Sequence, residues 1–311
     1  MRAHALASLQ LARLDGVVFF RLAVKITGML KRIGLAAIGL LFLFACNAVR
    51  FVPHNQLATL EGEQTARFFY PSASGNVEAY VTRPRGAGPF PLVILLHGHS
   101  IKGRGAEQLL GTAQVIAQEI CFATVAVSLP GYGSTEVSDG AIEDSTRQVV
   151  KDGISVARQI PWIDSRQLMF YGVSRGAIVA AAMISEIKDV RGAVLYAGAY
   201  DLARLYRETP SYFVRKMLNP NGDAKPKLAS FLAEASRWRA PTLILHGERD
   251  NLIPVNQSLL LRDQLKAAGT RHQLVLYPEH GHFLPRGSVR EQTVKFLKET
   301  TPPACPSPNP S

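Results

Sequence analysis

A serine between two glycines lies in the segment GVSRG at residues 172–176. The apolar residues before it predict a strand, and the Ala-rich run after it predicts a helix. In this strand–turn–helix setting, G-x-S-x-G predicts a sharp turn that presents Ser174 above the end of a sheet as a nucleophile. Gly172 and Gly176 are expected because the turn leaves no space for side chains on either flank.

A nucleophilic serine needs a base to accept its proton and an acid to orient that base. Asp250 follows a predicted strand in LILHGERDN, and His282 follows the next predicted strand in LVLYPEHGHF. Loops at the carboxyl ends of parallel strands meet at one edge of a sheet, so we expect these side chains to lie close together. The sequence therefore predicts Ser174 as nucleophile, His282 as general base and Asp250 as the orienting acid.

Two segments each hold a pair of histidines two residues apart, His97 with His99 and His280 with His282. On a strand this spacing puts both rings on one face, where they could bind zinc. Both segments begin where a predicted strand ends, and a metal site would leave the serine and the aspartate without a role. We therefore expect no metal and no cofactor, with His97 bonded to nearby backbone and His280 as a loop residue.

Predicted strands and helices alternate along most of the chain, and these elements must position the residues named above. Strands are predicted at 66–71, 77–84, 91–96, 121–129, 167–172, 190–198, 240–247 and 272–278, and helices at 106–120, 141–160, 177–187, 256–269 and 288–299. This alternation predicts an α/β fold with a mainly parallel, doubly wound sheet. Short helical fragments at 199–239 interrupt it and are interpreted as a small helical insertion over the sheet edge, or as plain connecting helices.

The N-terminal part of the chain has the features of an export signal. Two basic residues precede the uncharged, apolar run 33–45, which is shorter than the roughly 20 residues that span a bilayer. The segment LFAC at 43–46 resembles the end of a bacterial lipoprotein signal, which implies lipidation of Cys46. The resemblance predicts an exported protein of the cell envelope, held on a membrane by a lipid anchor. The alternative is an uncleaved signal anchor with an incidental cysteine.

Composition restricts the other possibilities. With 47% hydrophobic residues, the chain can bury a large core. The net charge is +11, but no dense Lys/Arg run with interleaved aromatic residues is present, so nucleic acid is not an expected partner. No C-x-x-C pair occurs, and Cys121, within an apolar run, is interpreted as a buried small hydrophobic residue.

Together these patterns predict one folded domain with extensions at both ends. The predicted division is an N-terminal extension with a signal at 1–46, a polar linker at 47–65, the α/β domain at 66–300 with its insertion at 199–239, and a disordered Pro/Ser-rich tail at 301–311.

The α/β domain resembles the α/β-hydrolases, and among them the group of dienelactone hydrolases and prolyl oligopeptidase catalytic domains. The resemblance rests on PLVILLHGH, SLPGYGST, YGVSRG, APTLILHGERDNLIP and LYPEHGHFL. It implies an oxyanion hole formed by the backbone N–H groups of His99 and Arg175. A tyrosine is usual in prolyl oligopeptidases where this chain has Arg175.

The resemblance implies a serine hydrolase that cleaves a carboxylic ester through an acyl-enzyme, without a cofactor. Two alternatives remain open. One is a serine peptidase that resembles the prolyl oligopeptidase catalytic domain and uses the same residues. The other is a membrane-anchored binding protein that has lost catalysis. The expected partners are a small ester or peptide substrate and a membrane.

Overall fold

The computed structural model describes residues 49–73, 75–138 and 144–301. Contacts divide the chain into two units, 1–49 and 50–311, and the second unit contains the sheet and its own hydrophobic core. The expected signal segment with Cys46, and the tail from residue 302 onward, lie outside the described residues. Among the described residues, no helix has the length and apolar character needed to cross a membrane.

The strands of the described chain form one sheet in the order β1-β2-β3-β5-β4-β6-β7-β8-β9. Pairing is antiparallel between β2 and β3 and between β3 and β5, and parallel elsewhere. The strands are β1 (Arg50–Phe51), β2 (Gln64–Ser72), β3 (Gly75–Arg83), β4 (Phe90–Leu96), β5 (Ala123–Val127), β6 (Ile163–Val173), β7 (Val190–Tyr196), β8 (Thr242–Gly247) and β9 (His272–Tyr277).

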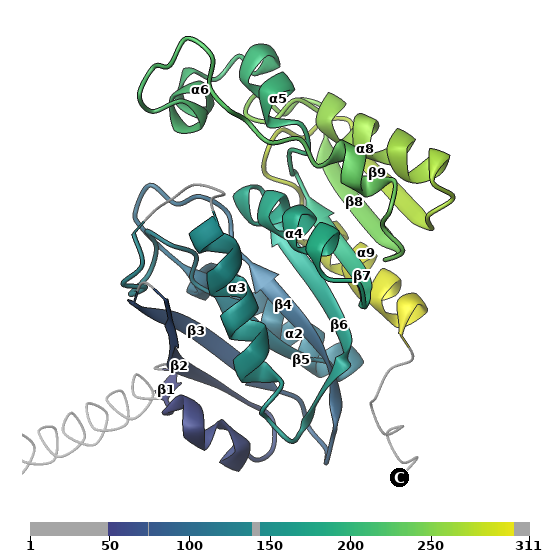
Figure 1. Cartoon of the computed structure of the whole chain (residues 1–311). Coiled ribbons are helices and arrows are strands. Elements are labelled where there is room, and N and C mark those ends of the chain that lie inside the picture. The colour runs from purple at the N-terminus through teal and green to yellow at the C-terminus, as the bar shows by residue number, and fades with distance from the viewer. Residues whose placement is uncertain (1–48, 74, 139–143, 302–311) are drawn as a thin grey trace, which may run out of the picture. The chain divides into compact units, whose positions relative to one another are not determined.

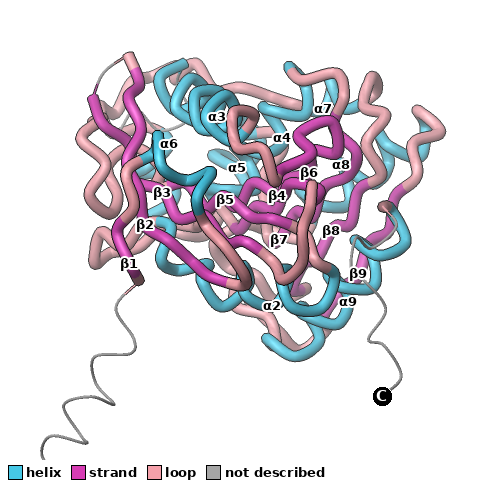
Figure 2. The backbone as a smooth tube through the Cα atoms, turned by 90° about the horizontal axis from the view of Figure 1, so that it is seen from below, coloured by secondary structure: helices cyan, strands magenta, loops and turns pink. Residues whose placement is uncertain are grey.

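Helices cover both faces of this sheet (Figures 1 and 2), which confirms the predicted fold class. Figure 2 shows α3, α4 and α8 on one side of the strands and α2 and α9 on the other. These helices are α2 (Leu110–Ile120), α3 (Asp144–Ala157), α4 (Arg175–Glu186), α8 (Asn256–Ala267) and α9 (Arg286–Thr300), and a 3₁₀ helix, η3 (Ala106–Leu109), leads into α2.

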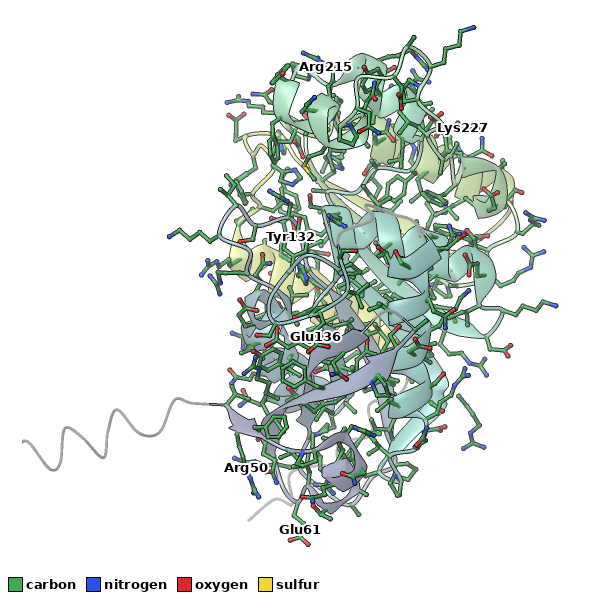
Figure 3. The ribbon with its side chains drawn as sticks, turned by 60° about the vertical axis from the view of Figure 1, so that its left-hand side comes forward. Arg50, Glu61, Tyr132, Glu136, Arg215 and Lys227 are labelled. Atoms are coloured by element: carbon green, nitrogen blue, oxygen red, sulfur yellow. The ribbon has the colours of Figure 1, made fainter. Side chains whose placement is uncertain are left out.

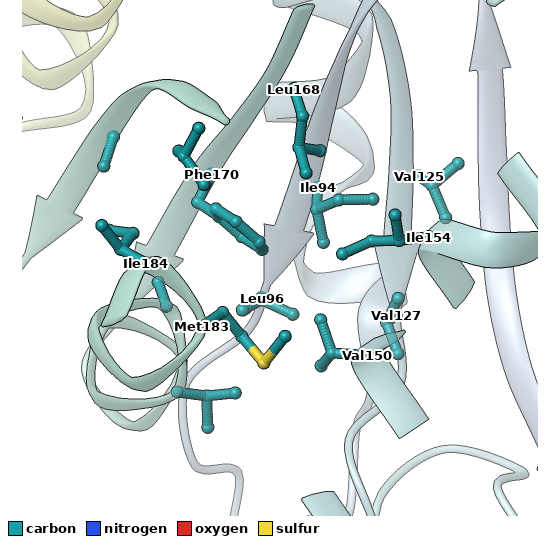
Figure 4. Close-up of a cluster of buried hydrophobic side chains, with 14 of the residues drawn as sticks. Ile94, Leu96, Val125, Val127, Val150, Ile154, Leu168, Phe170, Met183 and Ile184 are labelled. Atoms are coloured by element: carbon teal, nitrogen blue, oxygen red, sulfur yellow. The ribbon is translucent and has the colours of Figure 1, made fainter. Parts of the chain in front are cut away.

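The periodicity of the sequence explains why these elements form. Every residue of β4, β5 and β8 is buried, as expected of apolar strands covered on both faces. In α3 the buried residues recur at the three- and four-residue spacing of an amphipathic helix. Figure 4 shows Val150 and Ile154 of α3 packed toward Ile94 of β4 and Val125 of β5, in the main core.

The strand order reverses between β4 and β6. From β4 the chain passes through α2 to β5 on one side, and then through α3 to β6 on the other side of β4. Such a switch point opens a crevice at the carboxyl ends of the two strands, where open α/β sheets bind ligands. The loop that contains His97 and His99 follows β4, and Ser174 follows β6, so both lie at this crevice.

The segment expected as a polar linker at 47–65 differs from that prediction. It contains β1 and the 3₁₀ helix η2 (His54–Thr59), and it buries Val52, Leu57 and Leu60 in the main core. The indole N–H of Trp162 donates to the carbonyl oxygen of Leu57 at 3.1 Å. These few apolar residues are spaced irregularly among polar ones, so the segment shows neither a helical nor a strand period.

Within 199–239, the structure contains α5 (Leu202–Glu208), α6 (Tyr212–Leu218) and α7 (Leu232–Ala235). Asp201 caps α5 by accepting from the Arg204 N–H at 2.9 Å. α5 and α6 contact each other and lie together at the top of Figure 1. Their interpretation as an insertion over the sheet edge or as plain connecting helices stays a prediction.

Cys121 follows α2 in a left-handed conformation and is buried, as expected of a core residue. It is also disulfide-bonded, so the interpretation as a simple hydrophobic residue is incomplete. The other two cysteines of the chain, Cys46 and Cys305, lie outside the described residues.

Candidate active site

The turn between β6 and α4 holds Ser174 in a conformation that L-residues rarely adopt, with φ 52° and ψ −114°. The Ser174 N–H donates to the carbonyl oxygen of Tyr196 at 2.7 Å, which ties the turn to β7. The two glycines are needed for close approach. A Cβ at Gly172 would lie 2.5 Å from the carbonyl oxygen of Gly176, and one at Gly176 would lie 2.0 Å from that of Leu96.

The structure brings Ser174, His282 and Asp250 into one hydrogen-bonded chain. His282 Nε2 lies 2.9 Å from Ser174 Oγ, and His282 Nδ1 lies 2.7 Å from Asp250 Oδ2. Because an ionised carboxylate only accepts, Nδ1 carries the proton and Nε2 is left to accept from the serine hydroxyl. In the sequence 108 residues separate the serine from the histidine, so only the fold makes this contact.

Asp250 is held as a carboxylate by the groups around it. Its side chain is buried, and its Oδ1 accepts from the backbone N–H groups of Leu252 at 2.8 Å and Ile253 at 2.9 Å. Burial alone would raise the pKa of Asp250. Hydrogen bonds from His246 and His282 outweigh that effect and hold the pKa well below its usual range. The negative charge therefore stays available to orient His282.

His246 contacts Asp250 from the protein interior, a role that the sequence analysis did not predict. The ring is fully buried, and its Nε2 donates to the Ile253 carbonyl oxygen at 2.8 Å and lies 3.4 Å from Asp250 Oδ2. Its Nδ1 lies 2.6 Å from the hydroxyl of buried Ser258 on α8. The available signal was the position of His246 in HGERD, four residues before the aspartate.

Backbone contacts hold the two loops that present Asp250 and His282 against each other. The Arg249 N–H donates to the His280 carbonyl oxygen at 3.0 Å. A Cβ at Gly247 would lie 2.2 Å from the Gly281 carbonyl oxygen, so the end of β8 needs a glycine for the histidine loop to approach. Farther along this loop, the Leu284 N–H donates to the hydroxyl of Tyr196 at 2.6 Å.

The loop after β4 lies beside the serine, where the oxyanion hole is expected. A Cβ at Gly98 would lie 3.4 Å from Ser174 Cβ. The side chains of His99 and Arg175 meet at Tyr132. Its hydroxyl lies 2.5 Å from His99 Nδ1 and accepts from Arg175 Nη1 at 3.3 Å. Tyr132, in the turn at 130–134, thus contacts the side chains of both residues whose backbone N–H groups the family resemblance assigns to the oxyanion hole.

His97 has the structural role that the sequence predicts for it. The ring is fully buried, its Nε2 accepts from the Leu129 N–H at 3.0 Å, and its Nδ1 donates to the Gly98 carbonyl oxygen at 2.7 Å. Burial, with a further contribution from the charge of Arg175, lowers the pKa of His97 to about 4. The neutral imidazole therefore links the loop after β4 to the segment after β5.

A pocket of about 1240 Å³ opens at Ser174 and His282. Its wall is mainly apolar, and none of its described lining residues is Asp or Glu. Residues from α4, α5, α6 and the loop after β9 contribute apolar side chains, among them Ile178, Leu205, Phe213, Val214, Met217 and Leu284. Such a pocket can hold a large apolar group next to the serine.

The two pairs of histidines do not come together around one metal. His97 uses both ring nitrogens on backbone groups and His282 uses both on Ser174 and Asp250, while His280 packs edge-on against Tyr277 at 6.0 Å. Within the described parts of the chain, no three His, Cys, Asp or Glu side chains gather as a metal site would require.

We expect His97 to make stability depend on pH between about 6.5 and 4. The unfolded chain binds a proton at this histidine below about pH 6.5 and the folded chain only near 4, so its contribution is complete above 6.5 and lost as the pH falls. The wild type should lose about 3 kcal/mol of unfolding free energy over this range, and His97→Asn correspondingly less. Urea unfolding at several pH values checks this, and parallel pH slopes for the two proteins would contradict it.

Comparisons with known proteins agree with this geometry. The chain is 26% identical over 245 residues to the uncharacterized peptidase YuxL of Bacillus subtilis, covering 71% of this chain and 36% of that one. It thus spans about a third of the length of that relative. Among solved structures, an acylaminoacyl peptidase of Pyrococcus horikoshii has a TM-score of 0.62 at 19% identity, covering 78% of this chain and 42% of that one.

The esterase Pf2001 of Pyrococcus furiosus has a TM-score of 0.63 at 16% identity, covering 81% of this chain and 96% of that one. At these identities the solved structures show a shared fold, that of the α/β-hydrolases. Residues 129–301, more than half of the chain, match the profile of the prolyl oligopeptidase family. The chain therefore belongs to the prolyl oligopeptidase family, a family of serine hydrolases within the α/β-hydrolase superfamily.

Proposed function

We propose that this protein is a serine hydrolase that cleaves a carboxylic ester through Ser174, His282 and Asp250. The observation that carries the proposal is the pair of hydrogen bonds made by His282, at 2.9 Å to Ser174 Oγ and 2.7 Å to Asp250. They set the tautomer in which Nε2 can take the serine proton. The matched family supports the reaction class, and the substrate is inferred from the pocket.

In the first half of the reaction, Ser174 Oγ attacks the ester carbonyl carbon while His282 Nε2 accepts the hydroxyl proton. Asp250 stabilises the imidazolium that forms. The carbonyl oxygen becomes an oxyanion, and the backbone N–H groups of His99 and Arg175 are assigned to donate to it. Both residues lie against Tyr132, so the donors are held in place before the substrate arrives.

In the second half, the tetrahedral intermediate collapses and the bond to the alcohol oxygen breaks. His282 gives its proton to that oxygen, the alcohol leaves, and the acyl group stays on Ser174. Water then attacks the acyl-enzyme with His282 as base, and the carboxylic acid and the free serine are released. Each step uses groups that this chain supplies.

Replacement of the three residues tests this mechanism. Ser174→Ala should lower kcat by about 10⁵-fold and Asp250→Asn by about 10⁴-fold, because the residues act as one unit. A fluorophosphonate should add one adduct to the wild type, on Ser174, as measured by intact mass and peptide mapping. The matched control is Ser155→Ala, an exposed serine of α3, which should label and turn over like the wild type. A folded wild type that takes no adduct would overturn the assignment.

Peptide hydrolysis is the second candidate, because the curated relative and one of the solved structures bear the names of peptidases. The two candidates share the same residues, so only substrates distinguish them. We expect p-nitrophenyl butyrate to be cleaved with the higher kcat/KM, since the pocket is wide and apolar. Faster cleavage of N-acylated or prolyl peptide anilides at Ser174 would assign the protein to peptide chemistry.

We propose also that Cys46 is lipidated and attaches the protein to a membrane of the cell envelope. The signal-like segment before Cys46 supports this proposal, and the disulfide at Cys121, a bond that persists in oxidising compartments, supports export. In a bacterial host fed an alkyne fatty acid, the wild type should incorporate the label and fractionate with membranes, whereas Cys46→Ser should not incorporate it. Membrane fractionation without label would favour an uncleaved signal anchor instead.

A further inference from the structure

Exposed apolar side chains gather at the mouth of the pocket. Five large hydrophobic residues are strongly exposed among the described residues, and four of them lie in three segments around this mouth. Their exposed fractions are 91% for Ile101, 74% for Tyr212, 45% for Phe213 and 83% for Phe283. Isolated exposed hydrophobic residues are ordinary, but a cluster beside a binding pocket marks an interaction surface.

These residues come from separate parts of the chain that the fold brings to one place. We call segments 99–104, 211–218 and 280–290 the rim. Ile101, Phe213 and Phe283 all line the same pocket. The ring of Phe213 on α6 lies 5.1 Å from that of His99, and the ring of Phe283 lies 5.7 Å from that of His282. The rim therefore lies at the proposed catalytic site and includes His282.

The rim is also positively charged. Its three segments contain no Asp or Glu, and their basic residues are Lys102, Arg104, Arg215, Lys216, Arg286 and Arg290. Glu107 and Glu119, outside the rim, pair with Arg104 at 3.6 Å and Arg290 at 2.5 Å. Among the described residues, no acidic side chain pairs with Lys102 or Arg286. Lys102 directly follows the exposed Ile101, and Arg286 lies three residues after the exposed Phe283.

We propose that the rim docks the catalytic domain on a negatively charged lipid surface. Exposed Ile, Phe and Tyr side chains next to unpaired cations are the combination by which proteins enter an anionic membrane interface. Apolar residues insert between the lipids while the basic residues meet the headgroups. In this orientation the pocket opens toward the lipid, so that an amphiphilic ester reaches Ser174 without crossing water.

The charge pattern favours lipid over other partners. All charged residues of the three rim segments are basic, which complements a surface of anionic headgroups. A nucleic-acid surface would be basic but would not expose aliphatic Ile101 almost completely. Figure 3 shows Arg215 of the rim far from Arg50 on β1, and Ile101, Phe213 and Phe283 of its three segments line one pocket.

The first test measures vesicle binding with the chain that begins at Asn47, which retains the complete second unit, in a Ser174→Ala background. We expect cosedimentation with phosphatidylcholine vesicles that contain phosphatidylglycerol, and much weaker binding to phosphatidylcholine alone. Combined replacement of Ile101, Tyr212 and Phe283 by serine should weaken binding by more than about tenfold, since each side chain loses apolar burial. The matched control is Phe51→Ser, the exposed hydrophobic residue on β1 outside the rim.

The second test removes charge. The double variant Lys102→Gln/Arg286→Gln should weaken binding to the anionic vesicles by about 30-fold, since each basic residue near such a surface contributes about fivefold. The control is Arg158→Gln/Lys266→Gln, two exposed basic residues that follow α3 and end α8, away from the carboxyl ends of the strands. Thermal unfolding of every variant confirms that the fold is retained.

The outcomes separate this inference from the proposed function. Loss of binding in the rim variants, with both controls unchanged, supports it. Equal binding to neutral vesicles, equal binding by rim and control variants, or binding only to nucleic acid would overturn it. If the rim variants change the vesicle binding of the full chain but not that of the chain that begins at Asn47, the partner of the rim is the chain's own segment 33–45. The inference then also fails. Vesicle binding does not depend on the proposed function, whereas a preference for lipid esters rests on it. In each of these cases an adduct at Ser174 would therefore still support the assignment as a serine hydrolase.

Discussion

The site depends on one strained residue, Ser174, whose left-handed backbone would cost about 1 to 3 kcal/mol by itself. The fold holds it there from three directions. The Ser174 N–H bonds to β7, Gly176 packs against the carbonyl end of β4, and α4 begins directly after the turn. Because the turn is held by the core of the sheet, the fold itself positions the serine hydroxyl above the strand ends.

The strand order supplies the partners of this serine. Placing β5 between β3 and β4 leaves β4 next to β6, so the loop with His99 and the turn with Ser174 share one crevice. The loops after β8 and β9 then reach the same edge with Asp250 and His282. Buried His246 and Ser258 keep the aspartate in position, so a rigid interior supports the short chain of hydrogen bonds at the surface.

The loops around the site combine two properties. On their inner side they present polar groups to the proposed reaction, and on their outer side they expose the apolar and basic residues of the rim. Loops can carry such functions because the strands beneath them provide the stability. The proposed catalytic residues and the rim thus lie at the same edge of the sheet.

The sequence by itself determined the fold class and named Ser174, Asp250 and His282, because strand periodicity and the motifs after each strand are local signals. It also predicted that His97 bonds to nearby backbone. It did not determine the strand order, the packing of Leu57 in a segment that looked like a linker, or the bond of His246 to Ser258. Those contacts join residues that are distant in the chain or have no regular spacing, and only packing of the complete sheet brings them together. The tertiary structure likewise decided that three separate segments form one rim, because exposure and proximity are properties of the folded surface.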